Sequence, residues 1–207
     1  MRIKFIASLL RGANTVLDIG TDHCKVLIEA VSNGYIKKGI GADLNLGPLK
    51  NASKNIKKAN LENKITLIQS DGFKNIKADY DVVAITGMGF ELIKSILREP
   101  HQKPDYYLIG SHYQVHYLRK YLNENNYQII DEFIVFDKKY YLFLKVKEGK
   151  EILTNKDLYL GPLLKSKKEA IPYYNQSLIK LLKIKENHRS NEINTQIDYL
   201  KEILDSN

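Results

Sequence analysis

Short apolar runs alternate with stretches of helical periodicity over the first 150 residues of the chain. The runs that predict strands cover residues 15–19, 38–44, 65–70, 80–86 and 106–111. The segments between them that predict helices cover residues 25–33, 49–59 and 90–98, the second preceded by Gly47-Pro48. This alternation is typical of an α/β fold, in which a parallel sheet is covered by helices on both faces.

Two further runs rich in β-branched and aromatic residues follow, at 127–136 and 140–147. They face each other across Asp137-Lys138-Lys139, which predicts an antiparallel hairpin that closes one edge of the sheet. The chain then becomes polar at 148–151 and contains no later strand-like run. We therefore expect a first domain over residues 1–151 and a small helical domain over 152–207.

The second domain carries apolar residues at the spacing of paired helices. Ile193, Ile197, Leu200 and Leu204 form one apolar seam, and a second contains Tyr174, Leu178 and Leu181. These seams predict a short antiparallel coiled-coil hairpin that turns near residues 187–191. Its first half is rich in lysine, and both a solvated helix face and an RNA-facing surface fit that composition.

The overall charge agrees with a polyanionic partner. The 207 residues include 32 Lys and Arg against 24 Asp and Glu, a net charge of +8. The single cysteine, Cys24, excludes an internal disulfide, and neither cysteines nor histidines have metal-ligand spacing, so no metal is expected. No signal peptide or membrane-spanning run is evident, which predicts a cytoplasmic protein with no membrane partner.

The loop after the first predicted strand carries the most informative chemistry. Residues 16–23 read Val-Leu-Asp-Ile-Gly-Thr-Asp-His. A dinucleotide-binding loop needs Gly-x-Gly-x-x-Gly, so that a pyrophosphate can approach the backbone, but Asp22 and Lys25 occupy the second and third glycine positions. A carboxylate there repels phosphate and suits a cationic cofactor without phosphate, such as S-adenosylmethionine.

Polar residues and glycines also end the other predicted strands. Asp43 has the position of a ribose-binding carboxylate, and Asp71 with Gly72 that of an adenine-binding pair, while Gly87 and Gly89 expose carbonyls near the expected methyl group. Each residue alone also fits a helix cap or a tight turn. Their order along successive strand ends favours a nucleoside-cofactor site, because ligands bind at that edge of an open α/β sheet.

The motifs together resemble the bacterial tRNA (adenine(22)-N(1))-methyltransferase family, often called TrmK. The resemblance rests on Asp18-Ile19-Gly20-Thr21-Asp22-His23, Gly47-Pro48, Asp71-Gly72, Gly87-Met88-Gly89 and Gly161-Pro162-Leu163-Leu164. It implies a Rossmann-like class I methyltransferase domain followed by the coiled-coil domain. It also implies transfer of a methyl group from S-adenosylmethionine to N1 of adenine 22 in the D-arm of tRNA.

The resemblance also assigns residues to the site. The expected catalytic residues are Asp22 and Arg2, with His112 as a further candidate that also fits a hydrogen-bonded loop histidine. The expected cofactor-binding residues are Asp18, Gly20, Asp22, His23, Asp43, Leu44, Asp71, Gly72, Gly87 and Met88. Asp43 stands where the family usually has Glu. The chain departs from the family at Gly110-Ser111-His112, where Gln-Pro-Asn is usual, at Phe90, where a glycine is usual, and in a shorter N-terminal helix.

The chemistry of the target base adds a mechanistic expectation. N1 of neutral adenine carries a lone pair, so positioning dominates, and the Asp22 carboxylate can stabilise the cationic product or accept a proton from N6. N1 lies on the Watson-Crick edge, so the base must be extruded, and Phe90, His112 and Tyr113 could stack on it.

We expect tRNA as partner rather than DNA, with the oligomeric state open and a monomer favoured. The alternatives are a class I methyltransferase acting on another RNA or a small molecule, and a non-catalytic RNA-binding protein with the same fold. The missing glycines disfavour a nicotinamide-dependent oxidoreductase.

Overall fold

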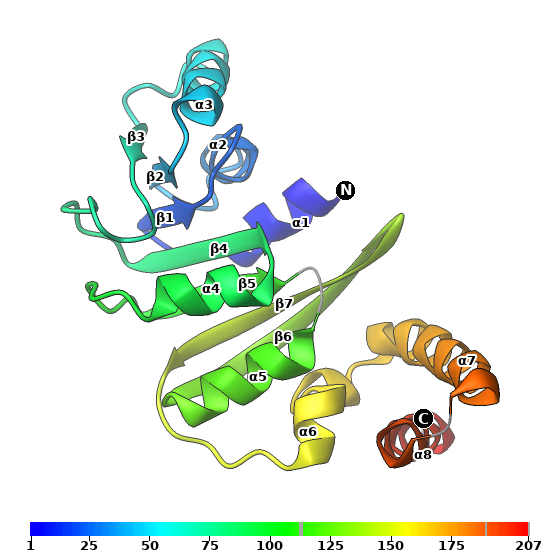
Figure 1. Ribbon diagram of the computed structural model, residues 1–207. Helices are drawn as coiled ribbons and strands as arrows, with labels where there is room; N and C mark the ends of the chain where they lie inside the picture. Colours follow the sequence, from blue (N-terminus) through cyan, green and yellow to red (C-terminus); the bar gives the residue numbers. More distant parts are fainter. Residues whose placement is uncertain (112–113, 189, 207) are drawn as a thin grey trace.

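A single twisted sheet of seven strands organises the molecule (Figure 1). The computed structural model describes residues 1–111, 114–188 and 190–206. The strand order is β3-β2-β1-β4-β5-β7-β6, with β7 antiparallel to both of its neighbours and the other neighbouring pairs parallel. The strands are β1 (Thr15–Ile19), β2 (Lys38–Asp43), β3 (Ile65–Gln69), β4 (Val82–Met88), β5 (Tyr106–Ser111), β6 (Tyr127–Asp137) and β7 (Lys139–Glu148).

Helices cover both faces of the sheet, as the alternating pattern predicted. One face is covered by α1 (Arg2–Leu9), α2 (Lys25–Ser32) and α3 (Leu46–Lys58), and the other by α4 (Phe90–Leu97) and α5 (Val115–Glu124). The chain runs outward from β1 to β3 and then returns to the other side of β1 with β4. This reversal creates a switch point at the carboxyl ends of β1 and β4, where ligands of such sheets bind.

The predicted hairpin is formed by β6 and β7, with Lys138 in a left-handed conformation (φ 66°) at its turn. Its tip reaches the start of the chain, because the backbone N–H of Arg2 donates to Oδ2 of Asp137 at 3.0 Å. Phe5 of α1 also packs on Phe143 of β7, with ring centroids 6.1 Å apart. The N-terminal helix is therefore held against the far edge of the sheet.

The C-terminal segment begins with the short helix α6 (Asn155–Leu160) and two 3-10 turns, η1 (Leu164–Ser166) and η2 (Lys168–Ala170). It ends with the two expected helices, α7 (Ile171–Asn187) and α8 (Asn191–Asp205), which pack on each other. Figure 1 places this helical pair beside the hairpin edge. The apolar cluster beneath it joins Ile134 and Leu142 of the hairpin to Leu160, Tyr174 and Leu200 of the C-terminal segment.

Several boundaries differ from the sequence-based expectation. Helix α3 begins at Leu46, three residues before the predicted start, with Pro48 inside its first turn. Strand β4 continues through Gly87 and Met88, with an irregular register against β5 at that point. Helix α5 was not among the helices predicted from the sequence. Its buried residues Leu118 and Leu122 are separated by Arg119, Lys120 and Tyr121.

Among the described residues, no helix combines the length and apolar character needed to cross a bilayer.

Candidate active site

The loop after β1 is shaped by residues in left-handed backbone conformations. Gly20, Asp22 and Cys24 have φ values of 75°, 49° and 58°. The backbone N–H groups of Gly20 and Thr21 both donate to the carbonyl of Ala42 in β2, at 2.8 and 3.0 Å. Gly and Asp tolerate this region better than most residues, which explains why they alternate in the motif.

Asp18, at the end of β1, carries a buried carboxyl group. Its exposed fraction is 3%, and the Thr21 hydroxyl donates to its Oδ2 at 2.7 Å. The pKa of Asp18 is raised to about 7, chiefly by burial; the Thr21 hydrogen bond opposes this rise and the charge of Asp43 adds to it. A buried carboxyl in this state gains from a cation placed beside it, because the cation favours the ionised form.

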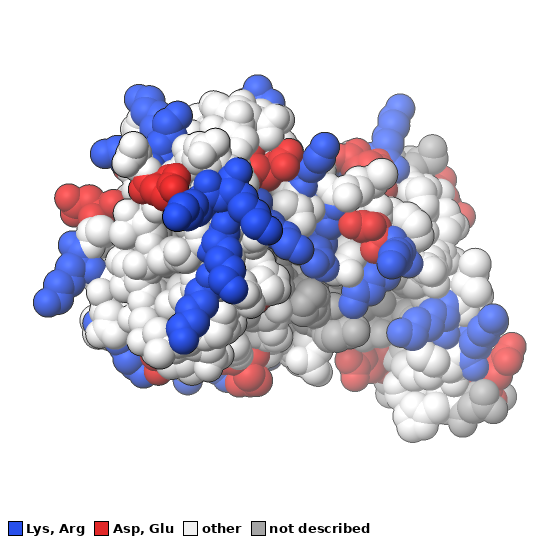
Figure 2. Space-filling view, turned by 90° about the horizontal axis from the view of Figure 1, so that it is seen from above, with Lys and Arg blue, Asp and Glu red and all other residues white. Residues whose placement is uncertain are grey.

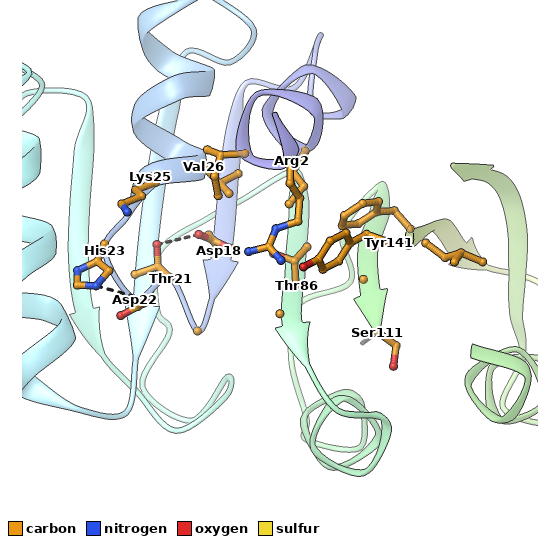
Figure 3. Close-up of a pocket in the computed structure, with 17 residues that line it drawn as sticks. Arg2, Asp18, Thr21, Asp22, His23, Lys25, Val26, Thr86, Ser111 and Tyr141 are labelled. Atoms are coloured by element: carbon orange, nitrogen blue, oxygen red, sulfur yellow. Dashed lines mark hydrogen bonds and ion pairs between the residues drawn. The ribbon is translucent and has the colours of Figure 1, made fainter. Parts of the chain in front are cut away.

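A cavity of about 380 Å³ opens beside this carboxyl group on the α1 and α2 side of the sheet (Figure 3). In Figure 3, Arg2 from α1, Asp18 from β1, Thr86 from β4 and Tyr141 from β7 surround the same space. The loop residues that line it are Gly20, Thr21, Asp22, His23 and Lys25. The structure therefore brings together residues from the start of the chain, the switch point and the hairpin.

Arg2 reaches the cavity because α1 is fixed at the hairpin. Its guanidinium carbon lies 4.4 Å from the centroid of the Tyr141 ring, a cation-π geometry. Its own backbone N–H is bonded to Asp137. Arg2 thus lines this cavity, and its catalytic role stays a prediction.

Asp22 and His23 lie at the rim of the cavity. The side chain of Asp22 is 64% exposed, and its Oδ2 lies 3.6 Å from Nε2 of His23. Asn55 of α3 donates to the backbone carbonyl of His23 at 3.0 Å and so fixes the loop. An exposed carboxylate at the rim can meet a base that enters from solvent.

Asp43 connects this loop to the next strand. Its Oδ2 accepts the backbone N–H of Asp22 at 3.2 Å, and its Oδ1 accepts that of Asn45 at 2.9 Å. Leu44, which follows, is 57% exposed, and its carbonyl accepts Nε2 of Gln69 at 3.0 Å. Asp43 is thus held at the sheet edge with lone pairs remaining for a ligand hydroxyl.

Asp71 and Gly72 form the next part of this edge. Asp71 is exposed and forms an ion pair with Lys74. Gly72 has φ 59°, and a Cβ there would lie 2.3 Å from Oε2 of Glu99, which accepts the backbone N–H of Phe73 at 2.7 Å. A side chain at Gly72 would have to displace the Glu99 carboxylate, and the left-handed backbone there favours glycine whatever the loop binds.

Gly87 and Met88 close the row at β4. Gly87 lines the cavity, and the methyl carbon of Met88 lies over Gly20, where a Cβ would come within 2.1 Å of it. Asp43, Leu44, Asp71, Gly72 and Met88 do not line the cavity itself. They continue from it along the carboxyl edge of the sheet, in the strand order β4-β1-β2-β3.

Two expected contributions are not found in the cavity. Phe90 does not line this cavity: its ring lies on the α4 and α5 side of the sheet, with its centroid 6.3 Å from those of Tyr117 and Tyr121, and its stacking on a target base stays a prediction. His112 and Tyr113 lie outside the described residues. Tyr141 and Thr21 also line the cavity but were not predicted as site residues, because Tyr141 is distant in sequence and the hydrogen bond from Thr21 to Asp18 cannot be read from the motif.

Two other chemistries receive no support. Cys24 is fully buried, and burial raises its pKa to about 12, which opposes formation of a nucleophilic thiolate. Within the described part of the chain, no group of three or more His, Cys, Asp or Glu side chains is arranged to hold a metal ion.

Comparison with known proteins identifies the family. The sequence model of the tRNA (adenine(22)-N(1))-methyltransferase family, TrmK, matches residues 16–207. The chain belongs to this family. A Bacillus subtilis tRNA (adenine(22)-N(1))-methyltransferase is 28% identical over 181 residues, which cover 82% of this chain and 76% of the relative.

Solved structures of TrmK proteins have the same fold. M. capricolum TrmK in complex with S-adenosylhomocysteine superposes with a TM-score of 0.84 at 29% identity, over 99% of this chain and 97% of that one. A Streptococcus pneumoniae protein described as a putative tRNA (m1A22) methyltransferase, in complex with S-adenosylmethionine, gives a TM-score of 0.86 at 27% identity, over 98% of each chain.

Proposed function

We propose that this TrmK chain methylates N1 of adenine 22 in tRNA, with S-adenosylmethionine as methyl donor and the cavity beside Asp18 as its active site. The observation that carries the proposal is the buried Asp18 carboxyl group at the switch point of a methyltransferase sheet. S-adenosylmethionine, when bound, supplies the methyl group from its cationic sulfonium. The tRNA substrate is the one that the family name specifies.

The residues of the site fit such a cofactor. Asp18 provides a carboxylate for a cationic group, and the loop lacks the glycines that a pyrophosphate would need. Gly20 presents backbone without a side chain, and Met88 covers it in this structure. Asp43 has the position and free lone pairs to accept both ribose hydroxyls, and Asp71 stands at the next strand end for the adenine amine.

The residues at the cavity rim provide the chemistry for the target base. Asp22 is the proposed catalytic carboxylate, which stabilises the cationic base that methylation produces and can accept a proton from N6. Arg2, fixed over Tyr141, is proposed to orient the incoming nucleotide. His112 remains a candidate from the sequence alone. An extruded base can reach Asp22 because this side chain is open to solvent.

A second hollow supports RNA as the substrate. A groove of about 700 Å³ lies between the hairpin edge and α7, and it shares Ser111 and Leu142 with the active-site cavity. Three lysines line it, Lys139, Lys180 and Lys183, together with Tyr140 and Tyr173. Such a lining suits a phosphate backbone and unstacked bases. We propose that part of the tRNA lies in this groove.

The charge distribution on the face that carries α3 agrees with a large anionic substrate. Figure 2, which looks down on the molecule from above, shows Lys and Arg side chains spread over this face with acidic groups between them. The exposed lysines of α3 are Lys50, Lys54, Lys57 and Lys58. We propose that this face attracts tRNA nonspecifically through its excess of exposed lysines.

The test is methylation of unmodified tRNA, followed by nuclease digestion and mass spectrometry for N1-methyladenine, with primer extension to locate the modified base. Wild-type protein should modify adenine 22. Asp22→Asn, which retains the shape and the left-handed backbone, should lower kcat about a hundredfold or more. Because Asp22 is also an expected cofactor-binding residue, the dissociation constant for S-adenosylmethionine is measured beside kcat to separate the two roles. The matched control Asp79→Asn removes an exposed carboxylate far from the cavity and should leave the rate unchanged.

Two outcomes would refute the assignment. Methylation at another position, or of a small molecule only, would support a different class I methyltransferase. Absence of cofactor binding and of transfer would support a non-catalytic RNA-binding protein.

A further inference from the structure

A buried ion pair joins the methyltransferase sheet to the C-terminal segment. Arg119 of α5 is 2% exposed and Glu132 of β6 is 1% exposed, and Nε of Arg119 donates to Oε1 of Glu132 at 2.8 Å. Both residues lie in the first 151 residues and outside the active-site cavity, although Arg119 also borders the groove, whereas Glu132 lines neither hollow. A buried charge pair needs further polar partners, and of the polar atoms of these two side chains only Nη2 of Arg119 has none among the residues that the structure describes.

Those further groups come from the segment that leads to the helical pair. Nη1 of Arg119 donates to the carbonyls of Leu158 and Tyr159, at 3.2 and 3.0 Å. Oε2 of Glu132 accepts the backbone N–H groups of Leu163 and Leu164, at 2.9 and 2.8 Å. The ion pair therefore binds the backbone of this segment from both sides of Gly161-Pro162.

The local sequence is adapted to this arrangement at two places. Gly161 has φ 102°, and a Cβ there would lie 2.6 Å from Oε2 of Glu132 and 2.8 Å from Nη2 of Arg119. In β6 the register shifts between Ile129 and Asp131, so buried positions change from Tyr127 and Ile129 to Glu132 and Ile134. This bulge turns Glu132 toward the buried side of the strand.

The segment held in this way carries one wall of the groove. In the first turn of α7, Tyr174 donates its hydroxyl to the carbonyl of Leu160 at 2.7 Å, and Tyr174 itself lines the groove. The lysines of α7 that face the groove, Lys180 and Lys183, follow on the same helix. The opposite wall, Lys139 and Tyr140, belongs to the hairpin that also lines the active site.

We propose that Arg119 and Glu132 are positioning residues for the tRNA substrate: they fix the helical pair so that the groove and the active-site cavity bind one tRNA simultaneously. This inference rests on the proposed function, because tRNA methylation is its kinetic readout. Two linked binding surfaces act together only when their geometry permits simultaneous contact. Loss of the pair should therefore weaken tRNA binding without affecting the cofactor site.

The test compares Arg119→Met and the milder Glu132→Gln with wild-type full-length protein. KM for tRNA should rise several-fold in Glu132→Gln, whose side chain does not line the groove, and roughly tenfold in Arg119→Met, which also removes a cation bordering the groove; the dissociation constant for S-adenosylmethionine should stay within about twofold of wild type in both. The matched control is Lys120→Met, which removes an exposed cation from the same helix and should change KM little. A purely structural role would lower the melting temperature and the active fraction but leave KM for tRNA unchanged.

A distance measurement tests the geometry separately. Spin labels at Lys57→Cys on α3 and Lys201→Cys on α8 report the separation of the two parts, and Cys24 is fully buried. The distance distribution should be narrow in wild type and broad in Arg119→Met. A narrow distribution together with a wild-type KM in a folded variant would overturn the proposal. Failure of wild-type protein to methylate tRNA would instead refute the proposed function, while the distances still decide whether the pair fixes the helices.

Discussion

Replacing Asp18 by asparagine should stabilise the cofactor-free protein in a pH-dependent way. The folded protein retains a proton on Asp18 up to about pH 7, whereas the unfolded chain releases it near 3.8. Stability therefore falls as pH rises between these values, because the unfolded state binds fewer protons there. At 1.36 kcal/mol per pH unit, ionising this buried group costs about 4 kcal/mol.

Asparagine has the same shape, cannot ionise and can accept the Thr21 hydrogen bond. We expect Asp18→Asn to exceed wild type in free energy of unfolding by about 1.5 kcal/mol near pH 5 and about 4 kcal/mol near pH 8. Urea denaturation followed by circular dichroism at both pH values measures the difference. The matched control is Asp22→Asn in the same loop, whose side chain is 64% exposed and which should change stability by less than about 0.5 kcal/mol.

The reasoning would be refuted if the gap between Asp18→Asn and wild type were equal at the two pH values. It would also be refuted if the variant were the less stable protein near pH 8.

Two more predictions concern the ligands. Asp43→Ala should weaken cofactor binding by about 1.5 to 3 kcal/mol, as expected for lost hydrogen bonds to a charged group, whereas Asp43→Glu should retain most of the affinity. Isothermal titration calorimetry measures both variants. An affinity of Asp43→Ala equal to that of wild type would contradict the ribose role. The double substitution Lys180→Met and Lys183→Met should reduce the slope of log affinity for tRNA against log salt concentration by about two. The control Lys64→Met, just before the amino end of β3, should leave this slope unchanged. An unchanged slope in the double variant would exclude Lys180 and Lys183 from phosphate contact.

The architecture could be predicted from the sequence because it depends on strong local patterns. The runs at 15–19 and 106–111 became β1 and β5 with the expected bounds, and the hairpin and the last two helices were also correct. The charged residue Arg119 is buried within α5, so the apolar pattern there was interrupted by a residue whose partners lie far away in sequence. The pattern of hydrophobic positions cannot show that Arg119 is buried, because its burial depends on an ion pair with Glu132 on another element.

The candidate site was predictable only along the strand ends. Gly20, Asp22 and Asp43 come together because parallel strands end at one edge, which follows from the order of the elements. The positions of Tyr141 and Arg2 at the cavity depend on contact between the N-terminal helix and the hairpin. No local sequence pattern predicts that contact, because the two segments are far apart in the chain. The proposed division at residue 151 stays a prediction, and the shared cluster of Leu142 and Leu160 argues that the two parts pack as a unit.

Unfavourable features are concentrated in the loop that follows β1. Asp18 is buried without a cation bonded to it among the described residues, and Asp22 and Cys24 have left-handed backbones that cost energy in residues with a Cβ. A loop selected only for stability would replace the buried Asp18, as the predicted gain of the asparagine variant implies. Its retention is explained if a bound cation recovers the cost, since such a ligand lowers the pKa of Asp18 and converts a destabilising group into a binding one. The instability of the free site and its affinity for a cationic cofactor thus have the same physical origin.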